Sequence, residues 1–449
     1  MKHPANQHAV VIGGSMAGLL TARVLSKHFG RVTIIERDPV HDQPEARKGQ
    51  PQTRHPHGLL TAGLNVLDCY FPGLATDLEE RGAIIADQGL SSRFFFAGSY
   101  RSPFESGLQG ILVSRPLLEW QLRRRVTALP NVTFEDECPA VNLVATPDCT
   151  QVTGVLIERR AAGKSTETLA ADLVVDATGR GSPAPKWLKS LGYSQLEESI
   201  IKIDVAYATR LYQRKTGDFG GAYVMLTLPA PPATQRGGFA LAQEDHRWMV
   251  TLAGWGGDHS PSDEAGFLEF ARSLPAPDIY EMIKRNEPLS EIVVYEVPTN
   301  LRRHYEKMNR FPEGYLVLGD AVCSFNPVYG QGMSSAALQA AELDKVLSEH
   351  QNLDDSQIRG MPIWKRFFKR VAKVVDTPWQ AAVGADFNYP TTKGKKQPGT
   401  DLINAYMTRV IKASNRDPIV SLAFMRVNNL LDPVTSLFHP RIVMRVLWS

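Results

Sequence analysis

The chain has 449 residues, enough for two domains and an additional segment. Its hydrophobic content of 43% and charged content of 22% are typical of a soluble globular protein. A net charge of +3 without a dense Lys/Arg tract gives no reason to expect nucleic acid as a partner. The four cysteines form no Cys-x-x-Cys pair, so we predict neither a metal site nor a disulfide framework.

The apolar run near the N-terminus does not have the pattern of a targeting segment. It is broken by Gly13-Gly14-Ser15, and no small-residue cleavage site follows a basic head. No uninterrupted apolar stretch of the sequence is long enough to span a bilayer. With reduced thiols as the default, we expect a cytoplasmic protein without a transmembrane segment.

The first elements form a β-α-β unit. Residues 9–13 are short, apolar and β-branched and predict a buried strand, residues 16–29 have helical spacing, and residues 32–36 predict a second strand. The polar segment 38–56 predicts an irregular loop. Residues 117–126 predict a helix after Ser114-Arg115-Pro116, because Pro is favoured in the first turn of a helix.

The later elements change in character along the chain. Residues 172–176 predict another buried strand, and residues 201–256 contain β-rich runs separated by Gly/Pro turns, which predict a separate antiparallel sheet. Residues 315–319 return to a buried strand, followed by a helix that begins near Met333. Residues 361–449 predict mostly helix, broken by a loop at residues 390–400.

A glycine-rich turn joins the first strand to the first helix, in the sequence Gly13-Gly14-Ser15-Met16-Ala17-Gly18. Such a turn lets the backbone approach a pyrophosphate, which then meets the N–H groups and positive dipole end of the helix. Ser15 replaces the usual middle glycine. Glu36 lies 18 residues after Gly18, at a position where a carboxylate can accept hydrogen bonds from the ribose hydroxyls. A tight turn in another kind of α/β protein is the alternative, but this context favours a dinucleotide site.

A second segment with ligand-binding character lies almost 300 residues later. Asp320 follows a buried strand, where a carboxylate can accept hydrogen bonds from ribityl hydroxyls. Gly330 and Gly332 let the backbone lie flat against a planar ring, and the helix near Met333 directs its positive end towards that ring. A glycine-rich turn before a packed helix is the alternative. Together, the two segments predict one FAD that joins distant parts of the chain.

These motifs carry a resemblance to a known superfamily. Residues 13–18, Glu36-Arg37, Ser114-Arg115, Gly319-Asp320 and residues 330–333 resemble the flavin sites of single-component aromatic hydroxylases, the p-hydroxybenzoate hydroxylase-like monooxygenases. Residues 114–120, 176–182 and 323–333 are similar to the flavin epoxidases of bacterial polyether pathways. The resemblance covers most of the chain, including Trp379 and the C-terminal helices.

The resemblance implies roles for individual residues. Arg115 would contact the FAD phosphates or ribityl chain, Asp320 would hold the ribityl chain, and the backbone N–H groups of Met333 and Ser334 would face the pyrimidine edge. Arg54 would approach the pyrophosphate or the ring, although Arg54 and Arg115 also fit solvated surface charges. The expected FAD contacts are Gly13, Gly14, Ser15, Met16, Ala17, Gly18, Glu36, Arg37, Arg54, Arg115, Asp320, Pro327, Gly330, Gly332, Met333 and Ser334.

The resulting fold class is α/β, with a Rossmann-like (GR2-type) FAD-binding domain, an antiparallel β-sheet substrate domain and a C-terminal helical region. The FAD-binding domain is expected at residues 1–180, with an insertion of the substrate domain near 85–110, and again at 301–345. The substrate domain is expected at 181–300 and the helical region at 346–449.

The electron donor follows less directly from the sequence. Many relatives carry Ala-Asp-Gly where this chain has Ala177-Thr178-Gly179, and in those relatives the Asp is tied to the handling of flavin and NADPH. A second glycine-rich β-α-β unit for a nicotinamide cofactor is missing from the sequence. We therefore expect NADPH or NADH to reduce the flavin, either by transient docking or through a separate flavin reductase.

The resemblance implies a monooxygenase in which reduced FAD and O2 form a C4a-hydroperoxide that transfers one oxygen atom. An apolar cavity would protect this species from water. An alkene needs no general base, whereas a phenol benefits from one. We found no convincing base, because the segment Glu244-Asp245-His246 reads best as a turn. The sequence therefore favours epoxidation of an alkene in a hydrophobic polyketide or terpenoid natural product.

Several alternatives stay open from the sequence. They are an aromatic hydroxylase, a prenyl-chain reductase or dehydrogenase, and a non-catalytic prenyl-binding protein of flavoenzyme fold. A halogenase is disfavoured because the Trp-x-Trp-x-Ile-Pro signature is missing. The basic, amphipathic segment 364–373 leaves weak peripheral membrane contact open. Inward packing of its aromatic residues is the favoured interpretation.

Two further features receive structural interpretations. Cys323 lies near the predicted ring, and we interpret it as a small buried apolar residue. A set of aromatic residues could line a substrate pocket, although core packing explains each of them equally well. These residues are Phe94, Phe95, Phe96, Tyr223 and Trp255.

Overall fold

The computed structural model describes residues 6–47, 50–160, 163–352 and 362–448. A five-stranded parallel sheet, in the order β18-β12-β1-β2-β8, forms the core of one half of the molecule. Its strands are β1 (His8–Ile12), β2 (Arg31–Ile35), β8 (Val132–Glu135), β12 (Leu173–Asp176) and β18 (Tyr315–Val317). The strands are short apolar runs, as expected where helices cover both faces of a parallel sheet.

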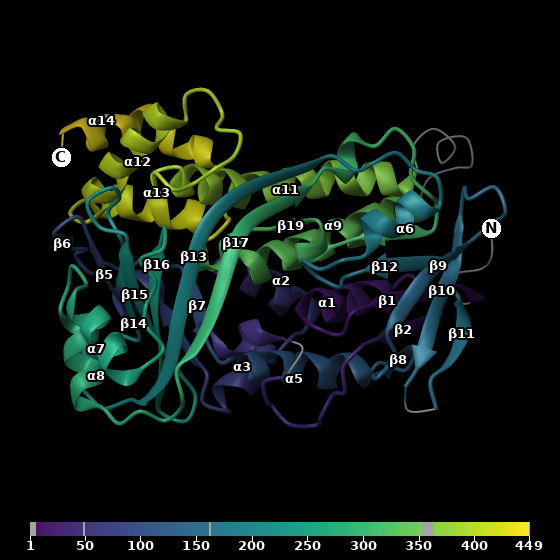
Figure 1. Ribbon diagram of the computed structural model, residues 1–449, viewed down its shortest axis with the longest axis horizontal. Coiled ribbons are helices and arrows are strands. Elements are labelled where there is room, and N and C mark those ends of the chain that lie inside the picture. Colours follow the sequence, from purple (N-terminus) through teal and green to yellow (C-terminus); the bar gives the residue numbers. More distant parts are fainter. Residues whose placement is uncertain (1–5, 48–49, 161–162, 353–361, 449) are drawn as a thin grey trace.

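Helices from distant parts of the chain pack together beside this sheet. Helix α9 (Gly332–Gln351) packs along α1 (Met16–Leu25) and α2 (Thr61–Tyr70), while α1 also contacts α5 (Arg115–Thr127). Figure 1 shows α1, α9 and α11 stacked in the middle of the molecule. Helices α3 (Leu74–Glu79) and α6 (Ala184–Ser190) and a three-stranded sheet complete this half. The strands of that sheet are β9 (Ala140–Ala145), β10 (Val152–Arg159) and β11 (Ser165–Ala170).

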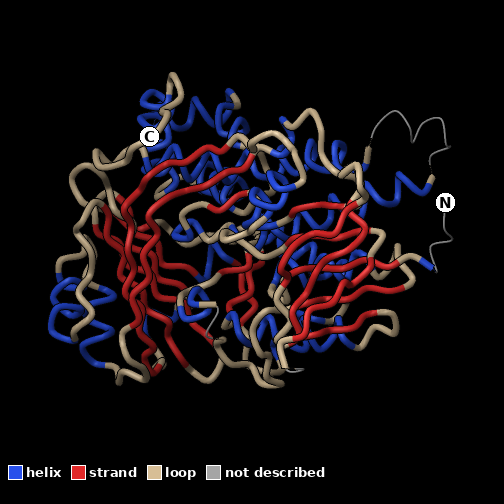
Figure 2. The backbone as a smooth tube through the Cα atoms, turned by 45° about the vertical axis from the view of Figure 1, so that its right-hand side comes forward, coloured by secondary structure: helices blue, strands red, loops and turns tan. Residues whose placement is uncertain are grey.

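An eight-stranded sheet forms the other half, in the order β19-β17-β13-β16-β15-β14-β5-β6. Figure 2 shows it as a separate group of strands. The pairings are antiparallel except for β14 with β5, which are parallel. Its strands are β5 (Ser92–Phe96), β6 (Ser99–Tyr100), β13 (Glu198–Gln213), β14 (Val224–Thr227), β15 (Arg236–Gln243), β16 (Arg247–Trp255), β17 (Val293–Arg303) and β19 (Cys323–Ser324).

The two faces of this sheet pack differently. Helices α7 (Glu264–Arg272) and α8 (Asp278–Arg285) cover one face, where Ala208 and Val250 lie in an apolar cluster. Tyr207 and Trp255 belong to a second cluster on the opposite face. The alternation follows the two-residue period of a strand. This opposite face forms one wall of a large cavity, and a small sheet of β3 (Gly58–Leu59), β4 (Ile84–Asp87) and β7 (Gln109–Leu112) lies nearby.

The C-terminal helices close the cavity from the other side. They are α11 (Ile363–Asp386), α12 (Thr400–Ser414) and α13 (Pro418–Asn428), and α14 (Pro440–Trp448) packs against α12 and α13. Figure 1 shows α12, α13 and α14 above the strands of the eight-stranded sheet. In the described ranges, no helix combines the length and the apolar character needed to cross a membrane. The aromatic residues of segment 364–373 are buried (Trp364, Phe367 and Phe368), which confirms the inward packing expected for that helix.

The fold class predicted from the sequence is confirmed, with shifts at element ends. The first helix ends at Leu25 rather than at residue 29, and the strand predicted at 315–319 ends at Val317. Gly319 adopts a positive φ of 73° that bends the chain out of the strand. The loop predicted at 38–56 contains one short 3-10 turn, η2 (Pro51–Arg54), with residues 48–49 outside the described residues. Residue 361, the predicted start of the helical region, is also outside them. The domain boundaries remain a prediction.

Candidate flavin and substrate site

The glycines of the phosphate turn (residues 13–18) are held where side chains do not fit. Gly13 has a φ of 106°, and a Cβ at Gly18 would lie 1.8 Å from the Gly13 carbonyl oxygen. This closeness requires glycine, because real Cβ contacts are far longer. The Gly14 N–H donates to Glu36 Oε2 at 2.8 Å, so Glu36 fastens the turn to the end of β2.

A buried ion-pair network lies beside the phosphate turn. Ser15 Oγ donates to Glu119 Oε1 at 2.6 Å, and Arg115 bonds to the same carboxylate and to Ser15 Oγ. Arg47 donates to Glu119 Oε2 at 3.2 Å and lies 3.4 Å from Glu36 Oε2. Burial alone would raise the pKa of Glu119, but the two arginines and Ser15 outweigh it and lower the pKa. The network therefore places two guanidinium groups, each paired with a carboxylate, beside the turn where the sequence predicts a pyrophosphate.

Asp320 lies at the carboxyl end of β18, in the turn η5 (Gly319–Ala321). Asp320 is accessible to solvent, although Gly319 and Ala321 on either side of it are buried. Desolvation by the surrounding protein raises the pKa of its carboxyl, and Arg115 and Arg180 oppose the rise. A carboxylate within electrostatic reach of Arg115 links the second segment to the first.

Direct packing also joins the two segments. A Cβ at Gly319 would lie 2.9 Å from the Cβ of Ala17, in the first turn of α1. Strand β18 pairs with β12, which pairs with β1, so the carboxyl ends of these strands meet at one edge of the sheet. This edge is where open α/β sheets bind their ligands. The two glycine-bearing segments, although distant in sequence, lie together at this edge.

The other predicted FAD contacts have varied surroundings. Met16 and Met333 are buried at the starts of α1 and α9, and Ser334 Oγ accepts the Leu60 N–H at 3.2 Å. Arg37 is an exposed ion-pair partner of Asp38, and Arg54 is exposed at the end of η2. Their roles remain predictions. Pro327 and Gly330 line the large cavity, while Gly332 begins α9.

The sequence interpretation missed Arg47 and Glu119. Arg47 lies in the polar loop and contacts Glu119 across 72 residues, a pairing that no local pattern predicts. Glu119 had a detectable signal, because Arg115 and Glu119 are four residues apart on a predicted helix. Ser114 caps that helix by accepting the Leu117 N–H at 3.3 Å.

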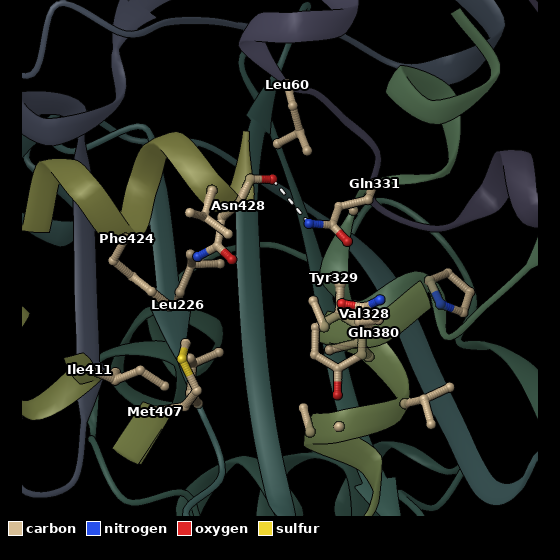
Figure 3. Close-up of a pocket in the computed structure, with 18 of the residues that line it drawn as sticks. Leu60, Leu226, Val328, Tyr329, Gln331, Gln380, Met407, Ile411, Phe424 and Asn428 are labelled. Carbon is tan, nitrogen blue, oxygen red and sulfur yellow. Dashed lines mark hydrogen bonds between the residues drawn. The ribbon is translucent and has the colours of Figure 1, made fainter. Parts of the chain in front are cut away.

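One cavity of about 1350 Å³ adjoins the second flavin segment. Residues from η6 (Pro327–Tyr329) to Gln331 line it, together with the eight-stranded sheet and helices α11 to α13. Figure 3 shows Met407, Ile411 and Phe424 on one side and Tyr329 and Gln331 on the other. Its volume exceeds the usual range for a small ligand, roughly 300–1,000 Å³, which leaves room for a flavin ring and an apolar substrate together.

Aromatic residues predicted for the pocket divide between its wall and the core. Phe94, Phe96 and Trp255 line the cavity. Phe95 points to the opposite face of β5 and packs in the core, where Tyr223 is also half-buried. The division on β5 follows the alternation of side chains along a strand.

His55 is a buried titratable group between aromatic residues of the cavity wall. It lies between Tyr207 and Tyr295, with ring centroids 6.0 and 5.4 Å away, and its Nδ1 is 2.7 Å from Thr209 Oγ1. Burial first, and the charge of Arg54 second, lower its pKa to about 4. His55 is therefore neutral near pH 7.

A buried polar network supports the cavity wall next to the second flavin segment. Asp386, fully buried at the end of α11, accepts from Asn300 Nδ2 at 2.7 Å, Asn326 Nδ2 at 3.0 Å and Tyr329 OH at 3.1 Å. Tyr207 OH donates to Asn326 at 3.1 Å. Burial raises the pKa of Asp386 to about 6 against the effect of these donors. The network joins α11, the eight-stranded sheet and the loop that precedes α9.

Three groups considered from the sequence have structural roles. Residues 244–246 form the turn between β15 and β16, and Glu244 accepts the Ser114 N–H at 2.9 Å. Cys323 is buried in the apolar core, where burial raises the pKa of its thiol. Thr178, the residue that replaces the expected Asp, donates both its N–H and its hydroxyl to Asp176.

The residues present fit FAD. The glycine positions of the phosphate turn leave no room for side chains, two arginines (Arg47 and Arg115) lie beside the turn, and Asp320 lies at the adjacent strand end. A Cβ built at Gly330 meets nothing within 4 Å, so open space lies in front of this backbone. Within the part of the chain that the structure describes, no group of three His, Cys, Asp or Glu side chains could hold a metal.

Comparisons with known proteins identify relatives of the whole chain. Protein Rv3254 of Mycobacterium tuberculosis is 31% identical over 441 residues, which cover 95% of this chain and 90% of that protein. The kynurenine 3-monooxygenase of Salinispora tropica is 25% identical over 362 residues, covering 77% of this chain and 73% of that protein. No protein-family model matches the chain.

Solved structures share the fold at low identity. A flavoprotein/dehydrogenase from Cytophaga hutchinsonii gives a TM-score of 0.67 at 16% identity, over 98% of this chain and 96% of that one. The p-nitrophenol 4-monooxygenase PnpA from Pseudomonas putida gives 0.65 at 16%, over 95% and 98%. The flavin-dependent brominase Bmp2 gives 0.65 at 13%, over 95% and 94%.

The chain belongs to the same family as the mycobacterial protein Rv3254. Its more distant relatives and the solved structures that share its fold include monooxygenases, two of them kynurenine 3-monooxygenases.

Proposed function

We propose that the chain uses FAD and O2 to add one oxygen atom to an apolar, unsaturated substrate, most simply by epoxidising an alkene of a polyketide or terpenoid natural product. The observation that carries the proposal is the large cavity, which runs from the loop carrying Gly330 into a wall of aromatic and aliphatic side chains. The likeness of residues 323–333 to polyether-pathway epoxidases supports the same reaction.

Reduced FAD, when bound, would react with O2 and so provide the oxygen atom that is transferred to the substrate. The protein residues would hold the cofactor and exclude water from the reaction. The phosphate turn and the arginines beside Glu119 would bind the pyrophosphate, and Asp320 would orient the ribityl chain. The apolar wall around Phe424 and Met407 would exclude water from the reacting end of the substrate.

The choice of an alkene over a phenol rests on acid-base chemistry. A phenol has a pKa near that of tyrosine, about 10, while the pKa of His55 is about 4. A proton transfer from the phenol to this ring is uphill by about 8 kcal/mol. His55 is therefore unsuited to activate a phenol, whereas an alkene needs no base.

Aromatic hydroxylation is the second candidate, because two sequence relatives are kynurenine 3-monooxygenases.

For the electron donor we expect NADPH or NADH, which would reduce the flavin either directly or through a separate flavin reductase. The replacement of the relatives' Asp by Thr178 favours the reductase route. Threonine offers no carboxylate to a nicotinamide cofactor, and the Thr178 N–H and hydroxyl both donate to Asp176.

The proposal is tested by loading the purified chain with FAD and supplying reduced nicotinamide, a flavin reductase and polyene candidates under ¹⁸O₂. The expected product carries one ¹⁸O atom in an epoxide. Asp320→Asn should weaken FAD binding about tenfold or more, because it removes a charged acceptor of hydroxyl groups. Asp401→Asn is the matched control, since that carboxylate is 83% exposed on α12.

Two outcomes would contradict the proposal. A chain that binds no FAD would leave the dinucleotide interpretation without support. A loaded chain that reduces a double bond instead of adding oxygen would favour the prenyl-chain reductase alternative.

A further inference from the structure

Arg101 is a buried cation in the wall of the cavity. Its side chain follows β6, is 8% exposed and lines the same cavity as Phe94 and Gln88. Burial lowers its pKa to about 10, with Asp87 opposing the effect, so the guanidinium keeps its charge at pH 7. A buried charge needs compensation, because removing an ion from water costs several kcal/mol.

Among the described residues, no carboxylate lies within ion-pair distance of Arg101. Its NH2 group bonds to neutral oxygens of Gln88 and Ser92, and its Nε has no partner. The face of the Phe94 ring, with its centroid 5.1 Å from the guanidinium carbon, gives part of the compensation.

The nearby carboxylate of Asp87 is already occupied. It accepts the backbone N–H groups of Gly89, Leu90, Ser106 and Gly107 and the hydroxyl of Ser106. These bonds lower the pKa of Asp87 against the effect of burial, and they cap α4 (Gln88–Ser91). Asp87 therefore stabilises the turn rather than pairing with Arg101.

The remaining cations of the cavity wall differ from Arg101. Arg302 is paired with Asp376 at 2.6 Å, and Lys307 is paired with Glu197 at 2.6 Å. Lys395 and Lys412 are exposed. Arg101 is thus the buried cavity cation, within the described ranges, whose charge the protein leaves without a counter-ion.

Polar side chains gather around this arginine in an otherwise apolar wall. Gln88 and Asn429 bond to each other through both amide groups at 2.9 Å, and Ser92 bonds to Arg101. We define this polar corner as Gln88, Ser92, Arg101 and Asn429, all of which line the cavity. Gln88 and Asn429 are locked by their mutual bonds, so Arg101 is the group in the corner with donor capacity to spare.

We propose that Arg101 binds a carboxylate of the substrate, so that the substrate of this enzyme is an amphiphilic organic acid with its unsaturated apolar chain in the rest of the cavity. This inference rests on the proposed function, because it assigns the substrate class of the same cavity. One guanidinium balances the single charge of a carboxylate, whereas a phosphate monoester carries −1.5 to −2 at pH 7. A carboxylate also matches the fork of N–H donors that guanidinium offers.

The test measures binding by calorimetry with the FAD-loaded full chain and two probes of equal length, dodecanoate and dodecan-1-ol. We expect the wild-type chain to bind dodecanoate at least tenfold more tightly than the alcohol. Arg101→Gln should lower dodecanoate affinity about 10- to 100-fold and leave dodecan-1-ol affinity within twofold, as expected for the loss of a charged hydrogen bond.

Lys412→Gln is the matched control, because it removes a positive charge from the exposed part of the same cavity wall. It should change dodecanoate affinity by less than threefold, and that change should vanish at high salt, since exposed charges are screened. Equal wild-type affinity for the two probes would overturn the proposal without any variant. An equal loss of both probes in Arg101→Gln would overturn it as well, because it would assign Arg101 a structural role.

Failure of this inference is distinguishable from failure of the proposed function. Binding of the two probes needs no oxygen chemistry, so the carboxylate preference can hold when no ¹⁸O enters a product. Conversely, ¹⁸O could enter a neutral alkene while the two probes bind with equal affinity. That result would support the proposed monooxygenase function and contradict the acid-binding role of Arg101.

Discussion

His55 is a buried histidine between two tyrosine rings, and its surroundings fix its charge. The folded pKa of about 4 lies below the value of 6.5 for an unperturbed ring, so folding favours the neutral form. The stabilisation from this preference is fully present above pH 6.5 and is lost as the pH falls from 6.5 through 4. The residue therefore makes the fold sensitive to acid.

This sensitivity predicts a difference between the wild-type chain and His55→Gln. Between pH 7.5 and pH 5, the wild type should lose about 2 kcal/mol more of its free energy of unfolding than the variant loses. Urea unfolding at the two pH values measures both losses. His439→Gln is the control, because His439 is exposed. Between the two pH values this variant should lose as much of its free energy of unfolding as the wild type loses. Equal losses in wild type and His55→Gln would contradict the prediction.

Single residues were predictable from the sequence where their chemistry is local. Gly13 directly follows β1, Gly18 lies in the first turn of α1, and Asp320 lies in the turn after β18. At the two glycines the close approach of backbone atoms excludes a side chain. Arg47 and Asp386 were not predictable, because their partners lie 72 and up to 86 residues away and belong to other elements. Arg101 carries no motif, and its role depends on the lack of a paired carboxylate among the residues that the structure describes, which only the folded chain reveals.

At the scale of elements, the end of α11 anchors the loop that carries the second flavin segment. Asp386 accepts hydrogen bonds from β17, from this loop and from η6. Its pKa of about 6 is above the value of 3.8 for an unperturbed carboxyl. Its contribution to stability is therefore greatest at low pH and is lost as the pH rises through 6.

Asp386→Ala should lower the free energy of unfolding by about 3 kcal/mol or more, because it leaves three buried donors without their acceptor. The loss should be larger at pH 5 than at pH 8. Urea unfolding measures it, with Lys373→Ala on the exposed face of the same helix as a control that should stay within about 0.5 kcal/mol. A loss under 1 kcal/mol at both pH values would show that the network does not support the loop.

Elements were predictable in type more reliably than in extent. The phosphate turn, the parallel strands and the antiparallel sheet follow from apolar runs and turn residues. The pairing of β5 with β14 was beyond local patterns, because it joins residues more than 120 apart in sequence. Helix α9 begins at Gly332, close to its predicted start, since the preceding Gly330 adopts a left-handed conformation.

At the scale of the whole molecule, the C-terminal helices are fastened over the cavity by a few polar contacts. Asn429, at the end of α13, accepts from the Thr61 N–H at 2.9 Å and exchanges bonds with Gln88. Gln331 donates to the Asn428 carbonyl at 3.1 Å (Figure 3). These contacts join the helices to α2, to the polar corner and to the start of α9.

Asn429→Ala should loosen this closure without unfolding the parallel sheet. Amide hydrogen exchange in residues 400–448 should become about 10- to 100-fold faster, while the rate in β1 and β12 stays unchanged. Asn352→Ala, at the exposed end of α9, is the control and should leave both regions as in the wild type. Uniform acceleration throughout the chain would indicate global destabilisation and would contradict a local fastening role.

Strand β18 is synthesised long after β1 and β12 of the same parallel sheet, and this order has a consequence for folding on the ribosome. Strand β12 pairs with β1 on one side and with β18 on the other, and these partners are separated by about 300 residues. A nascent chain that has emerged through β17 therefore still exposes the edge of β12 whose backbone groups later pair with β18. Until residue 317 leaves the exit tunnel, this half-built sheet is open to pairing with other chains, and chaperone binding at that stage would protect it.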